Sequence, residues 1–312
     1  MGGMNVFITG VAGFLGSHLA DHFLQRGCTV SGCDNLIGGE YSNVPEGVEF
    51  TEADCRNYKA MELLTKDVDV VYHCAATAHE GLSVFSPSFI TDNIYGASIS
   101  LFSASIANDV KRIVYCSSMA RYGTNETPFK EDYETRPQDP YGIAKVAAEQ
   151  TLKTLCEAHG VEYVVAVPHN IYGPRQKYDD PFRNVASIMI NRIMRGLAPI
   201  VYGDGEQIRC FSYISDCVEP LALMATADVS GEVINIGPDS GEVSINELVS
   251  LLKYLLCADV NPEYMPDRPC EVKHATCSSD KARELLGFEA SVPLKDGMKK
   301  LIEDIAMRRP RS

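Results

Sequence analysis

The sequence predicts an α/β fold with a doubly wound parallel sheet and a smaller mixed α/β domain. Two observations carry this prediction. Over the first half of the chain, short runs rich in β-branched residues alternate with longer stretches that have helical periodicity. After residue 173 this alternation gives way to shorter elements, separated by loops rich in Pro, Gly and Asp. Regular alternation of strand and helix is typical of a parallel sheet covered by helices on both faces.

The first half supplies the elements of the sheet. We expect strands at 6–8, 29–33, 48–51, 68–73, 112–116 and 161–167, and helices at 16–26, 87–108 and 141–159. The strand at 68–73 is nearly all apolar, as expected of a strand covered on both faces. The first helix carries Leu19, Phe23 and Leu24 on one face, where they can pack against the sheet.

The second half adds a smaller unit. We expect helices at 181–195, 215–227, 244–256, 278–286 and 294–308, and strands at 200–202 and 233–236. We therefore divide the chain into a sheet domain over residues 1–172, to which the chain returns around 207–237, and a second domain over 173–312.

Composition excludes several kinds of function. The 312 residues include 28 basic and 42 acidic side chains, a net charge of −14, whereas a protein that coats nucleic-acid phosphates needs a basic face. The eleven cysteines form no C-x-x-C pair, so we expect no metal site and interpret them as small buried thiols in a reducing compartment. No apolar run approaches the roughly 18–20 residues that span a bilayer, and the N-terminal residues lack a signal-peptide pattern. We expect a cytoplasmic protein that binds neither nucleic acid nor membrane.

A glycine-rich turn follows the first strand directly. Gly10 allows a sharp turn, Gly13 lets a pyrophosphate approach the backbone, and Gly16 lets the helix pack closely on the strand. The N-terminus of the helix then offers N–H groups to an anion. Asp34 ends the second strand eighteen residues after Gly16, where a carboxylate accepts hydrogen bonds from a ribose diol and disfavours a 2′-phosphate. These features predict a Rossmann-type dinucleotide site that takes NAD rather than NADP.

A tyrosine and a lysine lie four residues apart in the helix expected at 141–159. This spacing puts Tyr141 and Lys145 on one helix face. A phenol with a pKa of about 10 is a poor base at neutral pH, but a neighbouring ammonium and a positive nicotinamide ring lower that pKa. Ser118, after the fifth strand, can hydrogen-bond a substrate hydroxyl and relay its proton to Tyr141. Alone, such a pair is more often part of a solvated helix surface. The glycine turn upstream favours a catalytic set here.

Together these motifs resemble one family. The chain is similar over nearly its whole length to the extended short-chain dehydrogenases/reductases, and within them to the NAD-dependent nucleotide-sugar epimerases and dehydratases, UDP-hexose 4-epimerases above all. The matching segments are Thr9 to Gly16, Asp34-Asn35-Leu36, Asp54-Cys55-Arg56, His73 to Ala76, Asn93 to Gly96, Ser117-Ser118, Tyr122-Gly123, Pro140 to Lys145, Asn170 to Arg175 and Gly203-Asp204-Gly205.

The resemblance implies a role for each matching residue. Ser118, Tyr141 and Lys145 would be catalytic, and the last two would also touch the cofactor. The other NAD contacts would be Gly10, Gly13, Phe14, Leu15 and Gly16 at the pyrophosphate, Asp34 and Asn35 at the adenosine ribose, Asp54 and Cys55 at the adenine, and Ala75, Ala76 and Asn93 toward the nicotinamide. A nucleotide-sugar would contact Asn170, Asn184, Ile200, Tyr202, Arg209, Arg268, Glu271 and Ala275. The two arginines would clamp its phosphates.

The two residues after Ser118 bear on the reaction. In the 4,6-dehydratases that the chain resembles, Asp-Glu follows the catalytic Ser or Thr, and nucleotide-sugar decarboxylases carry a glutamate in the same turn. Here Met119 and Ala120 stand at these positions, and neither can move a proton. The resemblance therefore implies that a sugar oxidised at C4 takes its hydride back on the opposite face. This outcome is 4-epimerisation, with NAD+ regenerated in place.

Several positions on the sugar side leave alternatives open. Val167-Pro168-His169 replaces an Arg-Pro-Phe or Arg-Tyr-Phe segment, so His169 either touches the sugar or fills the place of the missing ring. His79 and Glu80 would border the sugar, as residues that tune specificity or as a solvated loop pair. Ala275 would form the wall that meets the C2 substituent, which leaves both an N-acetylhexosamine and a plain hexose open.

Other functions on the same scaffold stay open. A net oxidoreductase, such as a keto-sugar reductase or a small-alcohol dehydrogenase similar to the threonine dehydrogenases, would use the same three catalytic residues and release its cofactor. Arg209 and Arg268 favour a nucleotide-sugar over a small alcohol. A non-catalytic NAD-sensing regulator would be expected to lose Tyr141 or Lys145, and both are present. Family members commonly dimerise through two helices of each subunit, so we expect a homodimer that uses the segments at 87–108 and 141–159.

Overall fold

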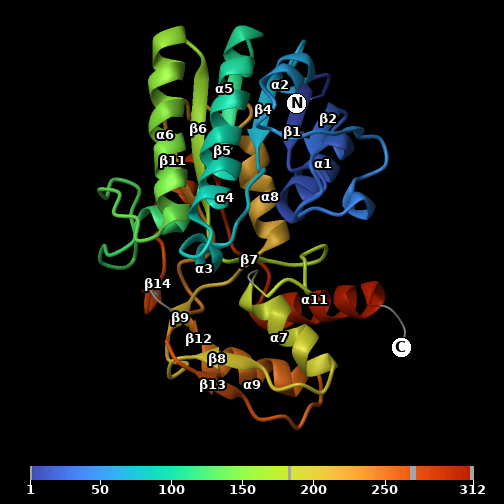
Figure 1. Ribbon diagram of the computed structural model, residues 1–312, viewed down its shortest axis with the longest axis vertical. Coiled ribbons are helices and arrows are strands. Elements are labelled where there is room, and N and C mark those ends of the chain that lie inside the picture. Colours follow the sequence, from blue (N-terminus) through green and yellow to red (C-terminus); the bar gives the residue numbers. More distant parts are fainter. Residues whose placement is uncertain (1, 182–183, 268–271, 310–312) are drawn as a thin grey trace.

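A parallel sheet of seven strands forms the centre of the computed structural model, which describes residues 2–181, 184–267 and 272–309 (Figure 1). Its strand order is β11-β6-β5-β4-β1-β2-β3, and each neighbouring pair is parallel. The strands are β1 (Asn5–Thr9), β2 (Thr29–Asp34), β3 (Glu49–Glu52), β4 (Val70–His73), β5 (Arg112–Cys116), β6 (Glu162–Pro168) and β11 (Val233–Ile236). The predicted α/β class with a doubly wound parallel sheet is confirmed.

The path of the chain across the sheet reverses next to β1. From β1 it moves to β2 and β3 on one side, and it then returns to β4, β5 and β6 on the other. In open parallel sheets, ligands bind outside the carboxyl ends of the strands at such a switch point. The ends of β1 and β4 are therefore the place at which the fold itself predicts a ligand.

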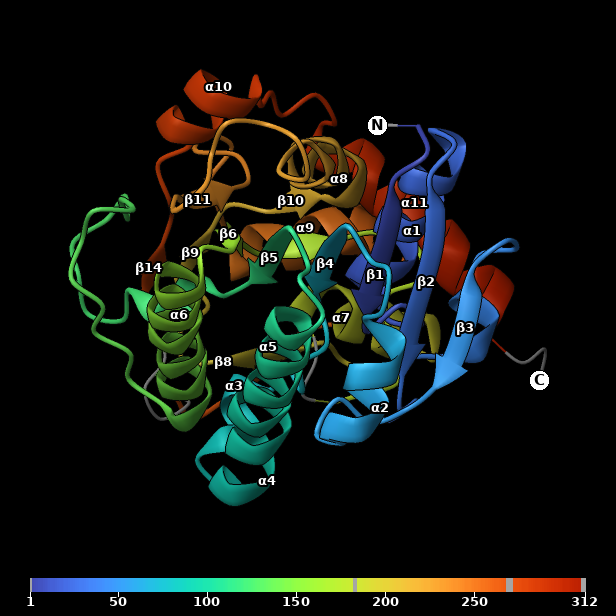
Figure 2. The ribbon, with the colours of Figure 1, turned by 90° about the horizontal axis from the view of Figure 1, so that it is seen from above.

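Helices cover both faces of the sheet (Figure 2). One face carries α1 (Phe14–Gln25) and α8 (Ile214–Leu223), and the other carries α2 (Tyr58–Leu64), α5 (Ala97–Ala107) and α6 (Pro140–His159). Because side chains alternate along a strand, β1 supplies both cores. Val6 and Ile8 pack with Leu19 of α1, whereas Phe7 packs with Leu101 of α5. All five side chains are buried.

The helices of the sheet region differ in part from the sequence prediction. The helix expected at 87–108 is interrupted: α4 (Pro87–Thr91) leads into a π-helical turn, η2 (Asp92–Gly96), before α5 begins at Ala97. A π turn adds one residue to a helical turn and rotates the following side chains, and apolar periodicity does not reveal so short an insertion. Helix α2 was not expected, because its seven residues span barely two turns.

Most of the remaining elements lie beyond the carboxyl ends of the sheet strands (Figure 1). They form small sheets of order β10-β7, β12-β9-β14 and β13-β8. The chain returns to the central sheet as β11, against which α10 packs. The division into domains at residue 172 stays a prediction. The elements are α3 (Glu80–Ser83), η1 (Tyr41–Asn43), η3 (Met119–Arg121), β7 (Ile171–Tyr172), α7 (Val185–Met194), β8 (Ile200–Tyr202), β9 (Ile208–Arg209), β10 (Ser212–Tyr213), β12 (Val243–Ser244), α9 (Ile245–Leu255), β13 (Glu263–Met265), β14 (His274–Ala275), α10 (Asp280–Leu286) and α11 (Leu294–Arg308). Within the described ranges, no helix has the length and apolar character needed to cross a membrane.

Candidate active site

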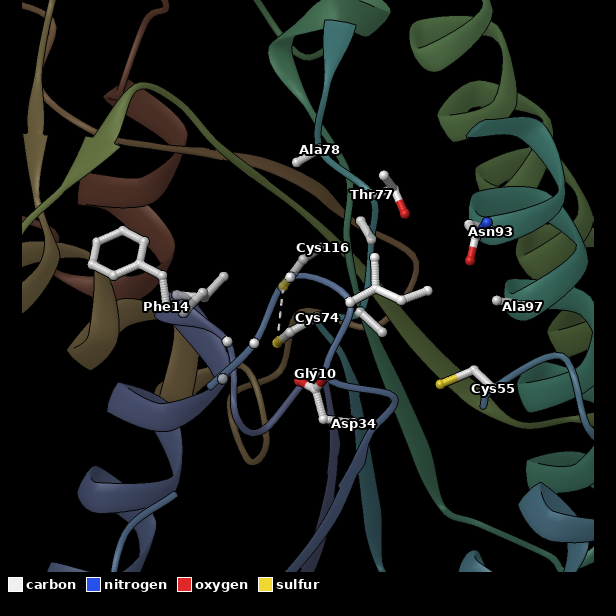
Figure 3. Close-up of a pocket in the computed structure, with 18 of the residues that line it drawn as sticks. Gly10, Phe14, Asp34, Cys55, Cys74, Thr77, Ala78, Asn93, Ala97 and Cys116 are labelled. Carbon is white, nitrogen blue, oxygen red and sulfur yellow. Dashed lines mark hydrogen bonds between the residues drawn. The ribbon is translucent and has the colours of Figure 1, made fainter. Parts of the chain in front are cut away.

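A cavity of about 270 Å³ opens at the carboxyl ends of β1, β4 and β5, next to the switch point of the sheet (Figure 3). Every residue that the resemblance assigns to the cofactor lines this cavity, and so do the three residues that it assigns to catalysis. The structure thus brings together Gly10, Gly13, Phe14, Leu15, Gly16, Asp34, Asn35, Asp54, Cys55, Ala75, Ala76, Asn93, Ser118, Tyr141 and Lys145.

The glycine turn leaves bare backbone along one wall of the cavity. Gly10 has a φ of +71°, and a Cβ there would lie 2.9 Å from the backbone N and Cα of Ala75. A Cβ on Gly13 would lie 3.0 Å from the carbonyl oxygen of Gly10, and one on Gly16 would overlap the same oxygen. Helix α1 begins directly after this turn, at Phe14, and its N-terminal dipole favours an anion. The turn therefore fits the pyrophosphate of a dinucleotide.

Carboxylates mark the other end of the proposed cofactor site. Oδ1 of Asp34 accepts a hydrogen bond from the backbone N–H of Leu36 at 2.8 Å, and the side chain is 7% exposed. Asp54 accepts hydrogen bonds from the guanidinium of Arg56 and the amide of Asn35. The hydrogen bond from Arg56 lowers the pKa of Asp54 to about 2. Negative charge at this end favours ribose hydroxyls and disfavours a 2′-phosphate.

Tyr141 and Lys145 come from the first two turns of α6. The helix begins where it does because Oδ1 of Asp139 accepts a hydrogen bond from the backbone N–H of Gly142 at 2.8 Å. Nζ of Lys145 donates to the carbonyl oxygen of Cys116 at 2.8 Å, and burial lowers the pKa of Lys145 to about 8. At pH 7 an ammonium therefore lies one helical turn from the Tyr141 phenol, where it favours the phenolate that can accept a proton.

Ser118 lies just after β5 and lines the same cavity as Tyr141. Its Oγ accepts a hydrogen bond from the backbone N–H of Ala120 at 3.2 Å. That bond orients the side chain and leaves the hydroxyl proton available for a substrate oxygen. The Tyr141 phenol, supported by the Lys145 ammonium and the Ser118 hydroxyl, can remove a proton from an alcohol in this cavity and return it.

A buried ion pair behind these residues was missed in the sequence. Glu149 accepts a hydrogen bond from the Ser117 hydroxyl and pairs with Arg121, whose Nη2 lies 3.0 Å from Oε2. Both ionic side chains are 7% exposed. Glu149 follows Lys145 by four residues, so the spacing 141, 145, 149 could have revealed a polar stripe on one face of α6.

A chain of buried hydrogen bonds joins the first strand to the π turn, and it too was missed. His73 Nδ1 lies 2.7 Å from Thr9 Oγ1, and its Nε2 lies 3.0 Å from Ser98 Oγ. Thr9 Oγ1 accepts from the backbone N–H of Ala75, and Ser98 Oγ donates to the carbonyl oxygen of Ile94. The Ser98 hydroxyl proton is thus already used, so Nε2 of His73 must donate to Ser98 Oγ, while Nδ1 accepts the hydroxyl proton of Thr9. The ring proton of His73 is therefore on Nε2. Burial lowers the pKa of His73 to about 3, so the ring is neutral at physiological pH.

The two histidines that we considered for the sugar side, His79 and His169, have different surroundings. His79 lines the cavity, is 8% exposed, and bridges to Asp180, with Nε2 and Oδ2 2.9 Å apart. It is therefore not part of a solvated pair, whereas Glu80 is exposed at the start of α3. His169 is buried outside the residues that line the cavity, and its Nε2 donates to the carbonyl oxygen of Pro238 at 3.2 Å. Burial lowers its pKa to about 4, so the ring is neutral at pH 7.

The residues that the resemblance assigns to the nucleotide-sugar lie on the smaller elements. Arg209 and Ala275 are direct register partners on β9 and β14. The amides of Asn170 and Asn184 donate to backbone carbonyl oxygens at 3.0 and 3.2 Å, and Asn184 also caps α7. None of these four described residues lines the cavity. Of the others, Ile200 and Tyr202 lie on β8, and Arg268 and Glu271 lie outside the described residues.

The sequence and the fold of the chain are similar to those of known proteins. A model of the "NAD dependent epimerase/dehydratase family" matches residues 6–237. The chain is 30% identical over 311 residues to the UDP-glucose 4-epimerase of Mycolicibacterium smegmatis, covering 96% of this chain and 98% of that protein. It is 32% identical over 306 residues to UDP-glucuronic acid decarboxylase 1 of Danio rerio, and the match covers 96% of this chain and 72% of that protein. A structure of the UDP-glucose 4-epimerase of Thermotoga maritima with UDP-glucose superposes on this chain with a TM-score of 0.93 at 33% identity. The match covers 97% of this chain and 99% of that one.

Proposed function

The chain belongs to the NAD-dependent epimerase/dehydratase family, and we propose that it is an NAD-dependent 4-epimerase of UDP-hexoses. One observation carries the proposal. Ser118, Tyr141 and Lys145 line one cavity together with the glycine turn, and the two residues that follow Ser118 are Met119 and Ala120. Neither of these two side chains can move a proton, so Tyr141 is the acid/base group at this turn, and moving a hydride off and back onto C4 requires no second one there.

The residues of the chain divide the chemical work among them. A bound NAD+ would supply the hydride acceptor and donor for C4 of the sugar. The backbone at Gly10 and Gly13 would hold the pyrophosphate, and Asp34 would accept hydrogen bonds from the ribose. Tyr141 takes the proton of the C4 hydroxyl, with Ser118 as the relay, and Lys145 stabilises the phenolate. Tyr141 then returns the proton, so the enzyme ends in the state in which it began.

The sugar side of the proposal rests on the smaller elements. Residues 173–312 would mainly hold the nucleotide-sugar, and UDP is favoured because relatives are named for UDP-sugars. Ala275 is 6% exposed and paired with Arg209, so a phosphate-binding cation and a small wall residue lie side by side. This arrangement suits glucose and N-acetylglucosamine alike.

Separate incubations with UDP-glucose, UDP-N-acetylglucosamine and UDP-glucuronate, followed by NMR and by absorbance at 340 nm, test the proposal. We expect the galacto epimer with no stoichiometric change in NADH, and Tyr141→Phe should abolish it while NAD still binds. Release of carbon dioxide would favour a decarboxylase, like the Danio rerio relative. A 4-keto-6-deoxy product would identify a dehydratase. Stoichiometric NADH would identify a net oxidoreductase.

We further propose a cytoplasmic homodimer that packs through α4, α5 and α6. Phe89 on α4 is 42% exposed and Ile143 on α6 is 56% exposed, and the two helices are in contact. Large apolar side chains exposed on adjacent helices are typical of an interface. Sedimentation of Phe89→Glu/Ile143→Glu beside the unmodified protein tests this, with a monomer expected for the variant.

A further inference from the structure

Two pairs of thiols lie near the cavity at nearly the same sulfur–sulfur distance. Sγ of Cys74 lies 3.7 Å from Sγ of Cys116, and Sγ of Cys33 lies 3.8 Å from Sγ of Cys55. Figure 3 shows the first pair beside the glycine turn. Because the distances match, any difference in reactivity between the pairs must come from their surroundings.

The Cys74–Cys116 pair is open to the cavity and lies beside a cation. Both cysteines line the cavity, and the ammonium of Lys145 donates to the carbonyl oxygen of Cys116. The hydrogen bond from the Cys74 thiol lowers the pKa of Cys116, and Lys145 lowers it further against the opposing effect of burial. The pKa of Cys74 is raised, so Cys74 keeps its proton. Of the two sulfurs, Cys116 is therefore the one that loses its proton more readily, and the thiolate is the reactive form.

The Cys33–Cys55 pair has the opposite electrostatic surroundings. Cys33 is fully buried and does not line the cavity, although Cys55 does. The hydrogen bond with Cys55, burial, and the carboxylates of Asp34 and Asp54 raise the pKa of Cys33. This pair is therefore an internal control for the first one: the distance is the same, but carboxylates replace the ammonium.

We propose that Cys74 and Cys116 form an oxidisable dithiol site, in which hydrogen peroxide that enters the cavity in the absence of NAD converts the two thiols to a disulfide. The Cys116 thiolate attacks the peroxide, so that an S–O bond forms, the O–O bond breaks and water leaves after protonation. The Cys74 sulfur then attacks Cys116, so that the S–S bond forms and the S–O bond breaks, releasing a second water. Two thiols lose two electrons and two protons, and the peroxide is reduced to two waters.

The backbone permits this bond. His73 and Tyr115, the residues just before the two cysteines, are register partners on β4 and β5. Neighbouring strands lie about 4.8 Å apart, which is within the Cα separation of about 4.4–6.8 Å that disulfides span. Closing the sulfur distance from 3.7 Å to about 2.05 Å shifts the strand end whose carbonyl oxygen holds Lys145. A displacement near 1 Å at a catalytic group costs about 100-fold in rate, so we expect turnover to fall by about that factor.

The test uses the full reduced chain, freed of cofactor and treated with a small excess of hydrogen peroxide at pH 7. Free thiols are then blocked with N-ethylmaleimide, and the digested protein is analysed by mass spectrometry. We expect a linked Cys74–Cys116 peptide pair, with Cys33 and Cys55 alkylated after denaturation, and dithiothreitol should restore activity. The proposal is overturned if Cys33–Cys55 links as fast, or if Cys116 is oxidised further without linking to Cys74.

Two variants and one ligand sharpen the result. Cys33→Ser, the matched control, should leave the Cys74–Cys116 link unchanged. Cys74→Ser should leave Cys116 as a sulfenic acid that reacts with dimedone. NAD+ added beforehand at roughly ten times its Kd should fill most of the cavities and slow formation of the Cys74–Cys116 disulfide by about tenfold or more. An equal rate with and without NAD+ would contradict the proposal that the bound cofactor protects the two thiols. Linking without NAD+ does not depend on which sugar the enzyme converts, so it is tested separately from 4-epimerisation.

Discussion

The carboxylate of Asp34 reaches from the end of the second strand to the glycine turn, where its Oδ2 accepts a hydrogen bond from the backbone N–H of Ala12 at 3.2 Å. One side chain therefore connects the part of the cavity that fits a ribose with the part that fits a pyrophosphate. Cofactor preference and the shape of the turn are coupled through this bond.

Replacing Asp34 should weaken NAD binding. In Asp34→Asn the negative charge that accepts ribose hydrogen bonds is lost, and a hydrogen bond to a charged group contributes about 1.5–3 kcal/mol. We expect the affinity for NADH, measured by fluorescence titration, to fall by about 10–100-fold. The ratio of the Kd for NADPH to the Kd for NADH should become smaller. Asp109→Asn removes the same charge from an exposed position and should bind NADH normally. An unchanged affinity in Asp34→Asn would exclude Asp34 from the ribose site.

A methyl group on the glycine turn should destabilise the protein. In Gly16→Ala the new Cβ overlaps the carbonyl oxygen of Gly10, so the turn or the helix must move. Overpacking of this kind costs about 1–3 kcal/mol, measurable by urea unfolding without cofactor. Gly81→Ala is the matched control, because a Cβ there meets nothing within 4 Å. Equal stability of the two variants would contradict the tight packing of the turn.

Local sequence patterns predicted the sheet and many of the residues that line the cavity at its edge, because both depend on short segments. Alternating strands and helices predicted the parallel sheet, and Gly10, Gly13 and Gly16 lie within seven consecutive residues where the first strand leads into the first helix. The pairs Cys74–Cys116 and His73–Ser98 escaped prediction, because strand order and helix placement bring together residues far apart in the chain. The sugar side was least predictable, because strands of two or three residues are too short to show periodicity.

Turnover should fall on the alkaline side as Lys145 loses its proton. Burial lowers the pKa of Lys145 from 10.5 to about 8, so its ammonium is present at pH 7 and is lost as the pH rises through about 8. A profile of kcat against pH should show this limb. Lys145→Met should lose about 10²–10⁴-fold in kcat at pH 7. The same variant should unfold at a higher urea concentration at pH 7, because it no longer buries a charge. A gain in stability without a loss of kcat would show that Lys145 has no role in catalysis.

The bridge between His79 and Asp180 should affect the sugar and leave NAD binding unchanged. Its two atoms lie 2.9 Å apart, and it connects the loop after β4 to the segment before α7. We expect His79→Gln and Asp180→Asn each to raise KM for the UDP-sugar while NADH affinity stays the same. The loss of sugar binding in the double variant, expressed as a free energy, should be smaller than the sum of the losses in the two single variants. We expect an interaction energy of about 0.5–3 kcal/mol between the two residues. Additive effects in steady-state kinetics would show that the two residues act independently.

Breaking the buried ion pair behind Ser117 should be costly, because it leaves one charge without its partner. In Arg121→Met the Glu149 carboxylate stays buried without the guanidinium that lies 3.0 Å away. Loss of one partner of a buried pair costs about 3–5 kcal/mol, measurable as a lower urea midpoint. Burial already raises the pKa of Glu149, so the loss should shrink as the pH falls and the carboxyl takes a proton.

Two comparisons separate this cost from a general effect of removing arginine. Arg136 pairs with Glu134 at 3.1 Å in an exposed position, and Arg136→Met should change stability by less than about 1 kcal/mol. Arg121→Met/Glu149→Met removes both buried charges and should recover most of the loss, because apolar side chains of similar volume replace a desolvated pair. If the double variant is no more stable than Arg121→Met, the cost comes from packing, and Glu149 supports the Ser117 end of the cavity by its shape instead of its charge.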